Sequence, residues 1–376
     1  MTSTIPTDIT DPLNARILAV SEDRIAGFLE DPFGEIARSS GLPLDAVLER
    51  LRAMLESGVI RRIRQTLMAT NLAPGALIAW RVAPERLDDA FEYLAKDDPF
   101  SGHVVIRSTD SETQGSVYRL WTTVKVPQGF SMMKHCELLA SRIGATAFRI
   151  MPAKRLFALG VGHVRRRGLE PGSRTAEPGQ VIDTNIVELS DLEWRVLGTL
   201  KREFTPDELQ AEPWRHRAEE AGVAYAEFLR VARGLAERGV IGRFSTFLEH
   251  VKPSSTGQRV TRYNALFHWR VPPGREIEAG REVGRHHIIT HAYWREGGPE
   301  FAQVNIMAVA HGTEKPAVLA HKEAIDRHLD AAGIPVSYTN VFWGGRSEIK
   351  PSEIMPHAYE AWLCTVGVDP AEMRTN

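Results

Sequence analysis

Apolar residues along the chain follow two spacings, one typical of helices and one typical of strands. Residues 31–39 (DPFGEIARS) predict a short helix, because Asp31 can cap it and Pro32 suits the first helical position. Apolar residues at helical spacing between Leu44 and Glu56 predict a second helix. The following segment, GVIRRIRQTLMA, predicts the strand pair of a wing. This region is therefore predicted to be a winged helix-turn-helix.

The pattern after this region predicts an α/β sandwich. ALIAWRV (76–82) is apolar enough for a buried strand, and an amphipathic helix follows it. A strand pair around the turn-rich DSETQG, a second helix and the strand ATAFRIMPA complete the order β-α-β-β-α-β. That order is typical of a ferredoxin-like sandwich. Residues 263–343 show the same order again.

Three sequence matches occur in the same order in both halves, which indicates an internal duplication. They are LESGVIRR (55–62) with AERGVIGR (236–243), ALIAWRVAP (76–84) with ALFHWRVPP (265–273), and GHVVIR ending at Arg107 with THAYWR ending at Arg295. A helix predicted from about Ala224 to Arg238, followed by GVIGRFSTFLEH, repeats the winged region. The segment between the halves is rich in Gly, Pro and charge, as linkers are.

The predicted fold is α+β, a tandem repeat of a winged helix-turn-helix and a ferredoxin-like sandwich. The predicted domains are a first winged helix-turn-helix (1–72), a first sandwich (73–162), a linker (163–184), a second winged helix-turn-helix (185–260), a second sandwich (261–345) and a C-terminal tail (346–376). Such sandwiches usually pair side by side, so we expect an internal pseudo-dimer, and a homodimer of the whole chain stays open.

The charge pattern disfavours DNA binding. Lys and Arg total 46 against 48 Asp and Glu, so there is no basic excess. The predicted recognition helices carry Asp45, Glu49 and Glu227 in their N-terminal halves, where they would face phosphates. The basic wing residues Arg61, Arg62 and Arg64 are the exception. They indicate a solvated strand edge, a phosphate-binding surface or a site for an anionic small molecule.

Cysteine usage and hydropathy bear on location. Cys136 and Cys364 lie far apart and form no CxxC pair, which fits a reducing cytoplasm. We recognise no signal peptide at the amino terminus and no apolar stretch near the roughly 20 residues of a membrane span. We therefore expect a cytoplasmic protein with no membrane partner.

A His-x-x-x-Arg spacing recurs at equivalent positions, His103 to Arg107 and His291 to Arg295. On a strand, residues i, i+2 and i+4 point to one face, so each imidazole would share a face with its guanidinium. That face spans about 13 Å at ~3.3 Å per residue, which suits a large planar anion. An imidazole can ligate iron or transfer a proton, and a guanidinium binds carboxylates. The alternative is that these are ordinary sandwich strands with a polar outer face.

The motifs together show a family resemblance. GVIGRFSTFLEH, YNALFHWRVP, ITHAYWRE and VNIMAVAHG resemble the siroheme decarboxylase branch of the Lrp/AsnC superfamily. In the first half, GVIRRIRQTL, RLWTTV and MPAKRLFALGV are similar to the partner subunit of that enzyme. The chain therefore resembles a fused form of the two homologous subunits.

The resemblance implies a carboxy-lyase that removes acetate carboxyl groups from siroheme. The products would be didecarboxysiroheme and carbon dioxide, in heme d1 synthesis or an alternative heme route. Loss of a carboxyl group leaves charge that a proton must meet, so a positioned His or Tyr is a plausible acid. No separate cofactor is expected, because the ring can take up the electrons. The iron tetrapyrrole would be the bound substrate or ligand.

The family's motifs also imply roles for single residues. Catalytic roles fall on His291, Tyr293 and Arg295, and substrate-binding roles on His103, Arg107, Arg243, His250 and His311. Val105 stands where the motif has tyrosine, so the second half is the expected catalytic face. His291 or His250 is the candidate ligand for the iron of the tetrapyrrole.

Two other functions stay open. One is a heme- or tetrapyrrole-sensing transcriptional regulator of the Lrp/AsnC type, and the other is a tetrapyrrole-binding protein without catalysis. The acidic residues at the starts of the recognition helices argue against the regulator.

Overall fold

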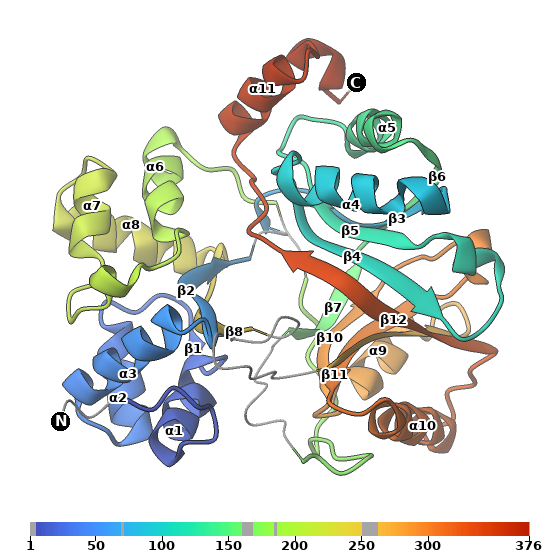
Figure 1. The fold of residues 1–376 in the computed structure, drawn as a ribbon, viewed down its shortest axis with the longest axis horizontal. Helices are drawn as coiled ribbons and strands as arrows, with labels where there is room; N and C mark the ends of the chain where they lie inside the picture. Colours follow the sequence, from blue (N-terminus) through green and yellow to red (C-terminus); the bar gives the residue numbers. More distant parts are fainter. Residues whose placement is uncertain (1–4, 69–70, 160–167, 184–185, 250–261, 376) are drawn as a thin grey trace. The chain divides into compact units, whose positions relative to one another are not determined.

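A computed structural model of the chain describes residues 5–68, 71–159, 168–183, 186–249 and 262–375. The chain divides into two compact units (Figure 1). The first contains the helix-turn-helix regions of both repeats, Met1–Met68 and Val187–Arg262, with Gly160–Gly168. The second contains both α/β modules and is formed by Ala69–Leu159, Leu169–Ile186 and Tyr263–Asn376. Corresponding domains of the two repeats are thus grouped together, although they are separated in the sequence.

The first unit is mainly helical. Its elements are α1 (Pro12–Ser21), β1 (Ile25–Ala26), α2 (Pro32–Ser40), α3 (Leu44–Glu56), β2 (Ile60–Leu67), α6 (Asp191–Leu200), a 3-10 turn (Pro206–Glu208), α7 (Arg215–Glu220), α8 (Tyr225–Glu237) and β8 (Ile241–Leu248). Asp31 caps α2, since its Oδ1 accepts a hydrogen bond of 2.7 Å from the Gly34 amide. The predicted helices α2, α3 and α8 are present, whereas α1, α6 and α7 were not predicted.

The wings differ from the prediction of a strand pair in each half. Each repeat contributes one wing strand, β2 or β8, and the two pair antiparallel in a sheet of order β1-β8-β2. The physical reason is that β2 contains no turn residue that would fold it back into a hairpin. Its backbone groups are instead satisfied by the other repeat.

The second unit contains the two ferredoxin-like modules. The first module has β3 (Gly75–Val82), a 3-10 turn (Pro84–Arg86), α4 (Leu87–Lys96), β4 (Ser101–Thr109), a 3-10 turn (Gln114–Val117), β5 (Leu120–Lys125), α5 (Met132–Ile143), β6 (Ala145–Pro152) and β7 (Arg155–Leu159). The second has β9 (Tyr263–Arg270), α9 (Glu276–Gly284), β10 (Ile289–Trp294), a 3-10 turn (Pro299–Phe301), β11 (Ile306–Gly312), α10 (Lys315–Ala331) and β12 (Tyr338–Ile349). A final helix, α11 (Pro356–Thr365), and a 3-10 turn (Pro370–Met373) follow.

The two modules share one continuous sheet of order β6-β3-β5-β4-β12-β9-β11-β10-β7 (Figure 1). The orders β6-β3-β5-β4 and β12-β9-β11-β10 are each the order of a ferredoxin-like module. The last strand of each module also pairs with the other module, β12 with β4 and β7 with β10. Neither β4 nor β10 is therefore left as an open edge.

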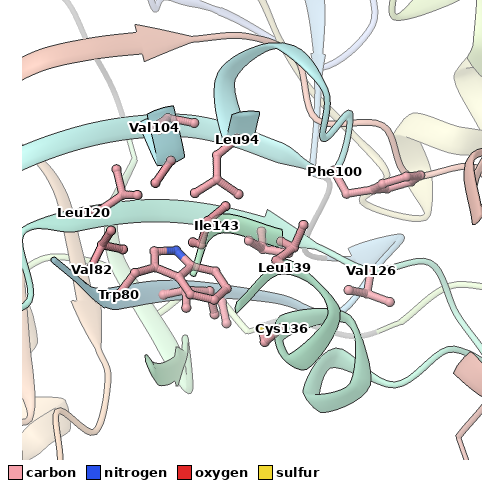
Figure 2. Close-up of a cluster of buried hydrophobic side chains, with 14 of the residues drawn as sticks. Trp80, Val82, Leu94, Phe100, Val104, Leu120, Val126, Cys136, Leu139 and Ile143 are labelled. Carbon is pink, nitrogen blue, oxygen red and sulfur yellow. The ribbon is translucent and has the colours of Figure 1, made fainter. Parts of the chain in front are cut away.

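Helices cover one face of this sheet. Trp80 and Trp269, at equivalent positions of the repeats, are both fully buried on that face, as expected. Figure 2 shows side chains of β3, β4 and β5 pointing toward Leu94 of α4 and Ile143 of α5. Since neighbouring residues of a strand point to opposite faces, the residues next to these lie on what we call the helix-free face. Its apolar core contains Val105, Trp121, Met151, Leu266, Met307 and Phe342.

The predicted C-terminal tail is part of the first module. β12 runs to Ile349, beyond its predicted end, and α11 packs against the core of the first module. Tyr359 and Leu363 of this helix are fully buried. The Tyr359 hydroxyl lies 2.9 Å from Nδ1 of His135, which is also fully buried. The tail therefore completes a hydrophobic core.

The predicted linker also packs on a module over its described residues. The Gly179 amide donates to the Arg281 carbonyl (2.9 Å), and the Thr175 amide donates to the Arg285 carbonyl (3.1 Å). Both acceptors lie in or just after α9. This stretch runs along the second module rather than standing apart as a spacer.

Replacing Tyr359 by phenylalanine should destabilise the protein by about 1–3 kcal/mol, because it leaves a buried imidazole nitrogen without its hydrogen-bond partner while the ring still packs. Denaturant unfolding followed by tryptophan fluorescence measures the change. Tyr338→Phe is the control, since the Tyr338 hydroxyl has no hydrogen bond among the described residues. Equal stability of both variants would show that the contact between α11 and His135 contributes nothing.

One imidazole lies within the apolar core of the helix-free face. His268 of β9 is 1% exposed, and its ring centroid lies 5.0 Å from that of Phe342 and 6.1 Å from that of Trp121. Burial lowers the pKa of His268 to about 3, and the charges of Arg107 and Lys322 act in the same direction. The imidazole is therefore neutral at neutral pH. The first repeat has an alanine, Ala79, at this position.

Stability should fall on acidification through this group. The pKa of His268 in the folded protein, about 3, lies below that of an unfolded histidine, about 6.5. Between these two pKa values, His268 binds a proton in the unfolded chain but not in the folded protein. The stability that this difference in pKa contributes is therefore complete above about pH 6.5 and is lost as pH falls toward 3. His268→Ala should reduce the slope of unfolding free energy against pH by about 1.4 kcal/mol per pH unit between pH 5.5 and 4. His216→Ala, at a side chain that is 57% exposed, is the control. An unchanged slope in His268→Ala would contradict the expectation.

Candidate functional site

The first His-x-x-x-Arg motif lies on β4, and the second begins on β10 and ends at Arg295, the residue after that strand. At these two strands the repeats exchange partners. His103 is paired in register with Ile349 of β12, and His291 with Leu159 of β7. Val105, the central residue of the first motif, belongs to the core of the helix-free face. Alternation along the strand places the histidine and arginine of each motif on that same face.

The second-repeat motif forms a stack of three side chains. The rings of His291 and Tyr293 are nearly parallel, at 10°, with centroids 6.2 Å apart. The Arg295 guanidinium carbon lies 4.4 Å from the centre of the Tyr293 ring, a cation–π contact. Arg295 is 8% exposed and donates a hydrogen bond to the Met151 carbonyl of the first repeat. The tyrosine thus lies between the imidazole and the guanidinium.

A threonine determines which His291 nitrogen carries the proton. Thr290 Oγ1 donates to the Val309 carbonyl (3.1 Å) and lies 3.1 Å from His291 Nδ1. Because a hydroxyl has only one hydrogen to donate, it must accept from Nδ1. The neutral imidazole therefore carries its proton on Nδ1, and its lone pair is on Nε2, the nitrogen that would take a proton or ligate a metal.

Burial shifts the titration of this stack. It raises the pKa of Tyr293, against the opposing effect of the adjacent Arg295 charge. It also lowers the pKa of Arg295, and Tyr293 opposes that shift. At neutral pH the phenol therefore keeps its proton and can act as a proton donor.

The first-repeat motif is arranged differently. Arg107 is 4% exposed, and its Nη1 lies 3.3 Å from Asn264 Oδ1 and 3.4 Å from the Phe342 carbonyl oxygen. Burial lowers the pKa of Arg107 to about 10, so it stays charged at neutral pH. Val105, at the position equivalent to Tyr293, has no ring on which the Arg107 guanidinium could stack. His103 Nε2 lies 2.9 Å from the Ser347 hydroxyl, in the C-terminal extension of β12.

Arg107 and Arg295 are buried cations with only neutral partners in the described residues. Their hydrogen bonds go to an amide oxygen and to backbone carbonyls, and within the described ranges neither forms an ion pair with a carboxylate. Burying a charge is costly unless an opposite charge compensates it. The helix-free face is therefore suited to an anionic ligand.

His311 is linked to the first-repeat arginine. It lies at the end of β11, and its Nε2 is 3.2 Å from Asn264 Nδ2, while Asn264 Oδ1 meets Arg107. The resemblance implied a substrate-binding role for His311, and the hydrogen bonds link it through Asn264 to Arg107 of the first repeat. Asn264 was not among the predicted site residues. A polar residue at the start of an otherwise apolar strand, YNALFHW, was the available signal.

Arg243 lies in the first unit, in a cluster with the wing arginines. Burial lowers the pKa of Arg64 to about 10, and the charges of Arg62, Arg61 and Arg243 contribute, against the effect of Glu203. Arg62 is 6% exposed and forms an ion pair of 2.9 Å with Glu203. The Nε atoms of Arg64 and Arg243 are buried without a hydrogen-bond partner among the described residues. This is not a solvated strand edge, and its positive charge suits an anion. His250 lies outside the described residues.

The described part of the chain contains neither a membrane-spanning helix nor a cluster of metal-ligating side chains. No helix there is both long and apolar enough to cross a membrane. The described side chains of His, Cys, Asp and Glu form no group of three or more that could hold a metal ion.

Comparison with known proteins supports the duplication. The family model of the AsnC-like ligand binding domain matches twice, at residues 73–158 and 261–340. The siroheme decarboxylase of Hydrogenobacter thermophilus is 25% identical over 304 residues, which cover 80% of this chain and 83% of that protein. The siroheme decarboxylase beta subunit of Desulfovibrio desulfuricans is 29% identical over 122 residues, 32% of this chain and 72% of that subunit.

Solved structures share the fold. The crystal structure of the siroheme decarboxylase NirDL matches with a TM-score of 0.65 and 21% identity, covering 94% of this chain and 97% of that one. A second crystal structure of NirDL, in complex with an iron-uroporphyrin III analogue, matches with a TM-score of 0.64 and 19% identity, covering 94% and 99%. The chain thus contains two AsnC-like ligand binding domains and is similar along most of its length to a siroheme decarboxylase, which is consistent with a fused, two-module siroheme decarboxylase of the Lrp/AsnC type.

Proposed function

We propose that this chain removes acetate carboxyl groups from siroheme, giving didecarboxysiroheme and carbon dioxide. The support from relatives is the similarity to proteins named siroheme decarboxylase, one of which aligns over 80% of the chain. A structural neighbour was solved with an iron-uroporphyrin III analogue, a large planar anion of the size that the motif spacing suggested.

The observation that carries the proposal is the uncompensated positive charge on the helix-free face. Arg107 and Arg295 are 4% and 8% exposed, and neither pairs with a carboxylate within the described ranges. A substrate with several carboxylates would supply the missing negative charges. Each guanidinium can hold a carboxylate through two parallel hydrogen bonds and so determine which acetate meets the proton donor.

The reaction needs one proton for each carboxyl group lost. The bond between the acetate methylene and its carboxylate carbon breaks, and carbon dioxide leaves. The electron pair stays on the methylene carbon and the adjoining ring, and a proton converts that carbon to a methyl group. Tyr293 and His291 are the candidate acids, and the stack holds the phenol beside Arg295.

Three further roles belong to this proposal. His291 Nε2 is a candidate ligand for the substrate iron, and His250 is the alternative. Arg243, within its arginine cluster, is a candidate contact for a substrate carboxylate. The conjugated ring would take up the electrons, so the proposal includes no separate cofactor.

The contacts of α3 disfavour the regulator. Arg50 is bound to Asp11, with 2.7 Å between Nη1 and Oδ1. Arg52 donates to the carbonyl oxygens of Pro206 and Leu209 in the other repeat. Both basic residues of this predicted recognition helix are thus engaged within the protein rather than presented to phosphates.

Anaerobic incubation of the purified chain with siroheme should give a product lighter by two molecules of carbon dioxide, as measured by mass spectrometry. Tyr293→Phe and His291→Ala should both lower turnover, and the variant that removes the acid should do so by about 100-fold or more. Lys96→Ala, at a side chain that is 73% exposed, is the control. Tight binding without mass loss would overturn the enzymatic proposal. A fully active His291→Ala/Arg295→Ala double variant would overturn the site.

Arg107→Met and Arg295→Met should each weaken siroheme binding by at least about tenfold, because each removes a charge-assisted contact. The ligand-free variants should unfold with a free energy no more than about 1 kcal/mol below that of the parent protein, because an apolar side chain replaces an uncompensated buried charge. Absorbance titration and denaturant unfolding measure the two effects. Strong destabilisation with unchanged binding would mean that the arginines serve the fold alone.

A further inference from the structure

Four strands align polar residues in a row across the helix-free face. Gly344 of β12 is paired in register with Arg107 of β4 on one side and with Asn264 of β9 on the other. Asn264 is paired in turn with His311 of β11. Arg107, Asn264 and His311 thus belong to one line of residues, although they are far apart in sequence.

Gly344, between Arg107 and Asn264, leaves room for the Asn264 side chain. A Cβ atom at this glycine would lie 3.3 Å from Asn264 Cβ and 3.4 Å from its Cγ, closer than most such contacts. Without that atom, the Arg107 guanidinium reaches Asn264 Oδ1 at 3.3 Å. The other end of the same amide, Nδ2, lies 3.2 Å from His311 Nε2.

The direction of both hydrogen bonds follows from donor chemistry. A guanidinium has only donors, so the asparagine must turn its oxygen toward Arg107. Its NH2 group then faces His311 and can only donate, so the imidazole Nε2 must accept. A neutral imidazole that accepts at Nε2 carries its proton on Nδ1.

We propose that Asn264 is a positioning residue that transmits the orientation set by Arg107 to His311 and holds the imidazole proton on Nδ1. Among the residues that the structure describes, the relay occurs once. At the equivalent positions the first repeat has Gly75, which lacks an amide, and Lys125, which lacks an imidazole. The relay therefore distinguishes the two ends of the helix-free face.

This inference deepens the proposed function and rests on it for its biological meaning. A substrate carboxylate needs a hydrogen-bond donor, and the relay determines which edge of the His311 ring presents one. In this relay, the Arg107 guanidinium of the first repeat determines the tautomer of His311 in the second repeat. The first repeat thus affects the second without supplying the acid.

Nitrogen NMR of the full-length protein labelled with ¹⁵N-histidine tests the relay without substrate. The His311 signals are assigned as those lost in His311→Gln. At a pH where the ring is neutral, Nδ1 should carry the proton in the parent protein. In Asn264→Asp, a carboxylate would accept from both Arg107 and the imidazole, so the proton should move to Nε2. Gly75→Asn is the matched control and should leave the His311 signals unchanged.

An Nε2 proton in the parent protein overturns the proposal, and so does an unchanged tautomer in Asn264→Asp. If Asn264→Asp does not fold, the spectrum of the parent protein still shows which His311 nitrogen carries the proton. Gly344→Ala then provides the second test: its added methyl group crowds the Asn264 amide and should produce a mixture of His311 tautomers. Asn264→Asp should also lower kcat/KM for siroheme roughly 10- to 100-fold. A parent protein with the predicted tautomer but no decarboxylation would refute the proposed function and leave the relay intact.

Discussion

In each ferredoxin-like module, the strand that carries the His-x-x-x-Arg motif lies at one edge of the module's own four strands. If the module stood alone, the outward-facing backbone groups of that strand would have no hydrogen-bond partner. Here each such strand, β4 or β10, pairs with a strand from the other repeat. The exchange makes one sheet of two modules and removes two open edges. It also determines the neighbours of the motif side chains. Arg107 meets the Phe342 carbonyl of the second repeat, and Arg295 meets the Met151 carbonyl of the first.

This arrangement stores positive charge where water has little access. The idealised cost of moving an ion into a protein interior is of order 20 kcal/mol, and several kcal/mol persist after relaxation. Carbonyl oxygens, an amide and the Tyr293 ring offset part of that cost for Arg107 and Arg295. A carboxylate partner from within the chain would offset more, but it would also neutralise the face. Where no described carboxylate pairs with them, these charges cost stability, and under the proposed function they would bind the carboxylates of the substrate.

Much of this architecture could be predicted from the sequence, because period and repetition are local properties. The alternation in HVVIR and HAYWR predicted strands with His103, Arg107, His291 and Arg295 at positions that share a face. The duplication predicted two modules, and the AsnC-like domain matches both. The burial of Trp80 and Trp269 followed from apolar strands.

What could not be predicted depends on contacts between distant segments. Hydrophobic period does not say which strand pairs with which, so the β2–β8 pair and the exchanged strand β7 were missed. The position of α11 depends on the contact between the Tyr359 hydroxyl and His135, two residues that are far apart in the sequence. Asn264 is polar in an apolar strand, but its importance comes only from the two partners that the sheet brings to it.

Fusion of the two modules permits an asymmetry that a dimer of identical chains cannot have. In a symmetric dimer every residue occurs twice, so an amide in one site implies the same amide in the other. In the fused chain, Asn264 and His311 can face Arg107 while Gly75 and Lys125 occupy the equivalent positions. Tyr293 can likewise stack on Arg295 while Val105 stays apolar. One end of the helix-free face thus has the imidazole of His311, and the other has the amine of Lys125. A ligand whose carboxylates are not equivalent would then be held in one orientation, because its two ends meet different chemistry.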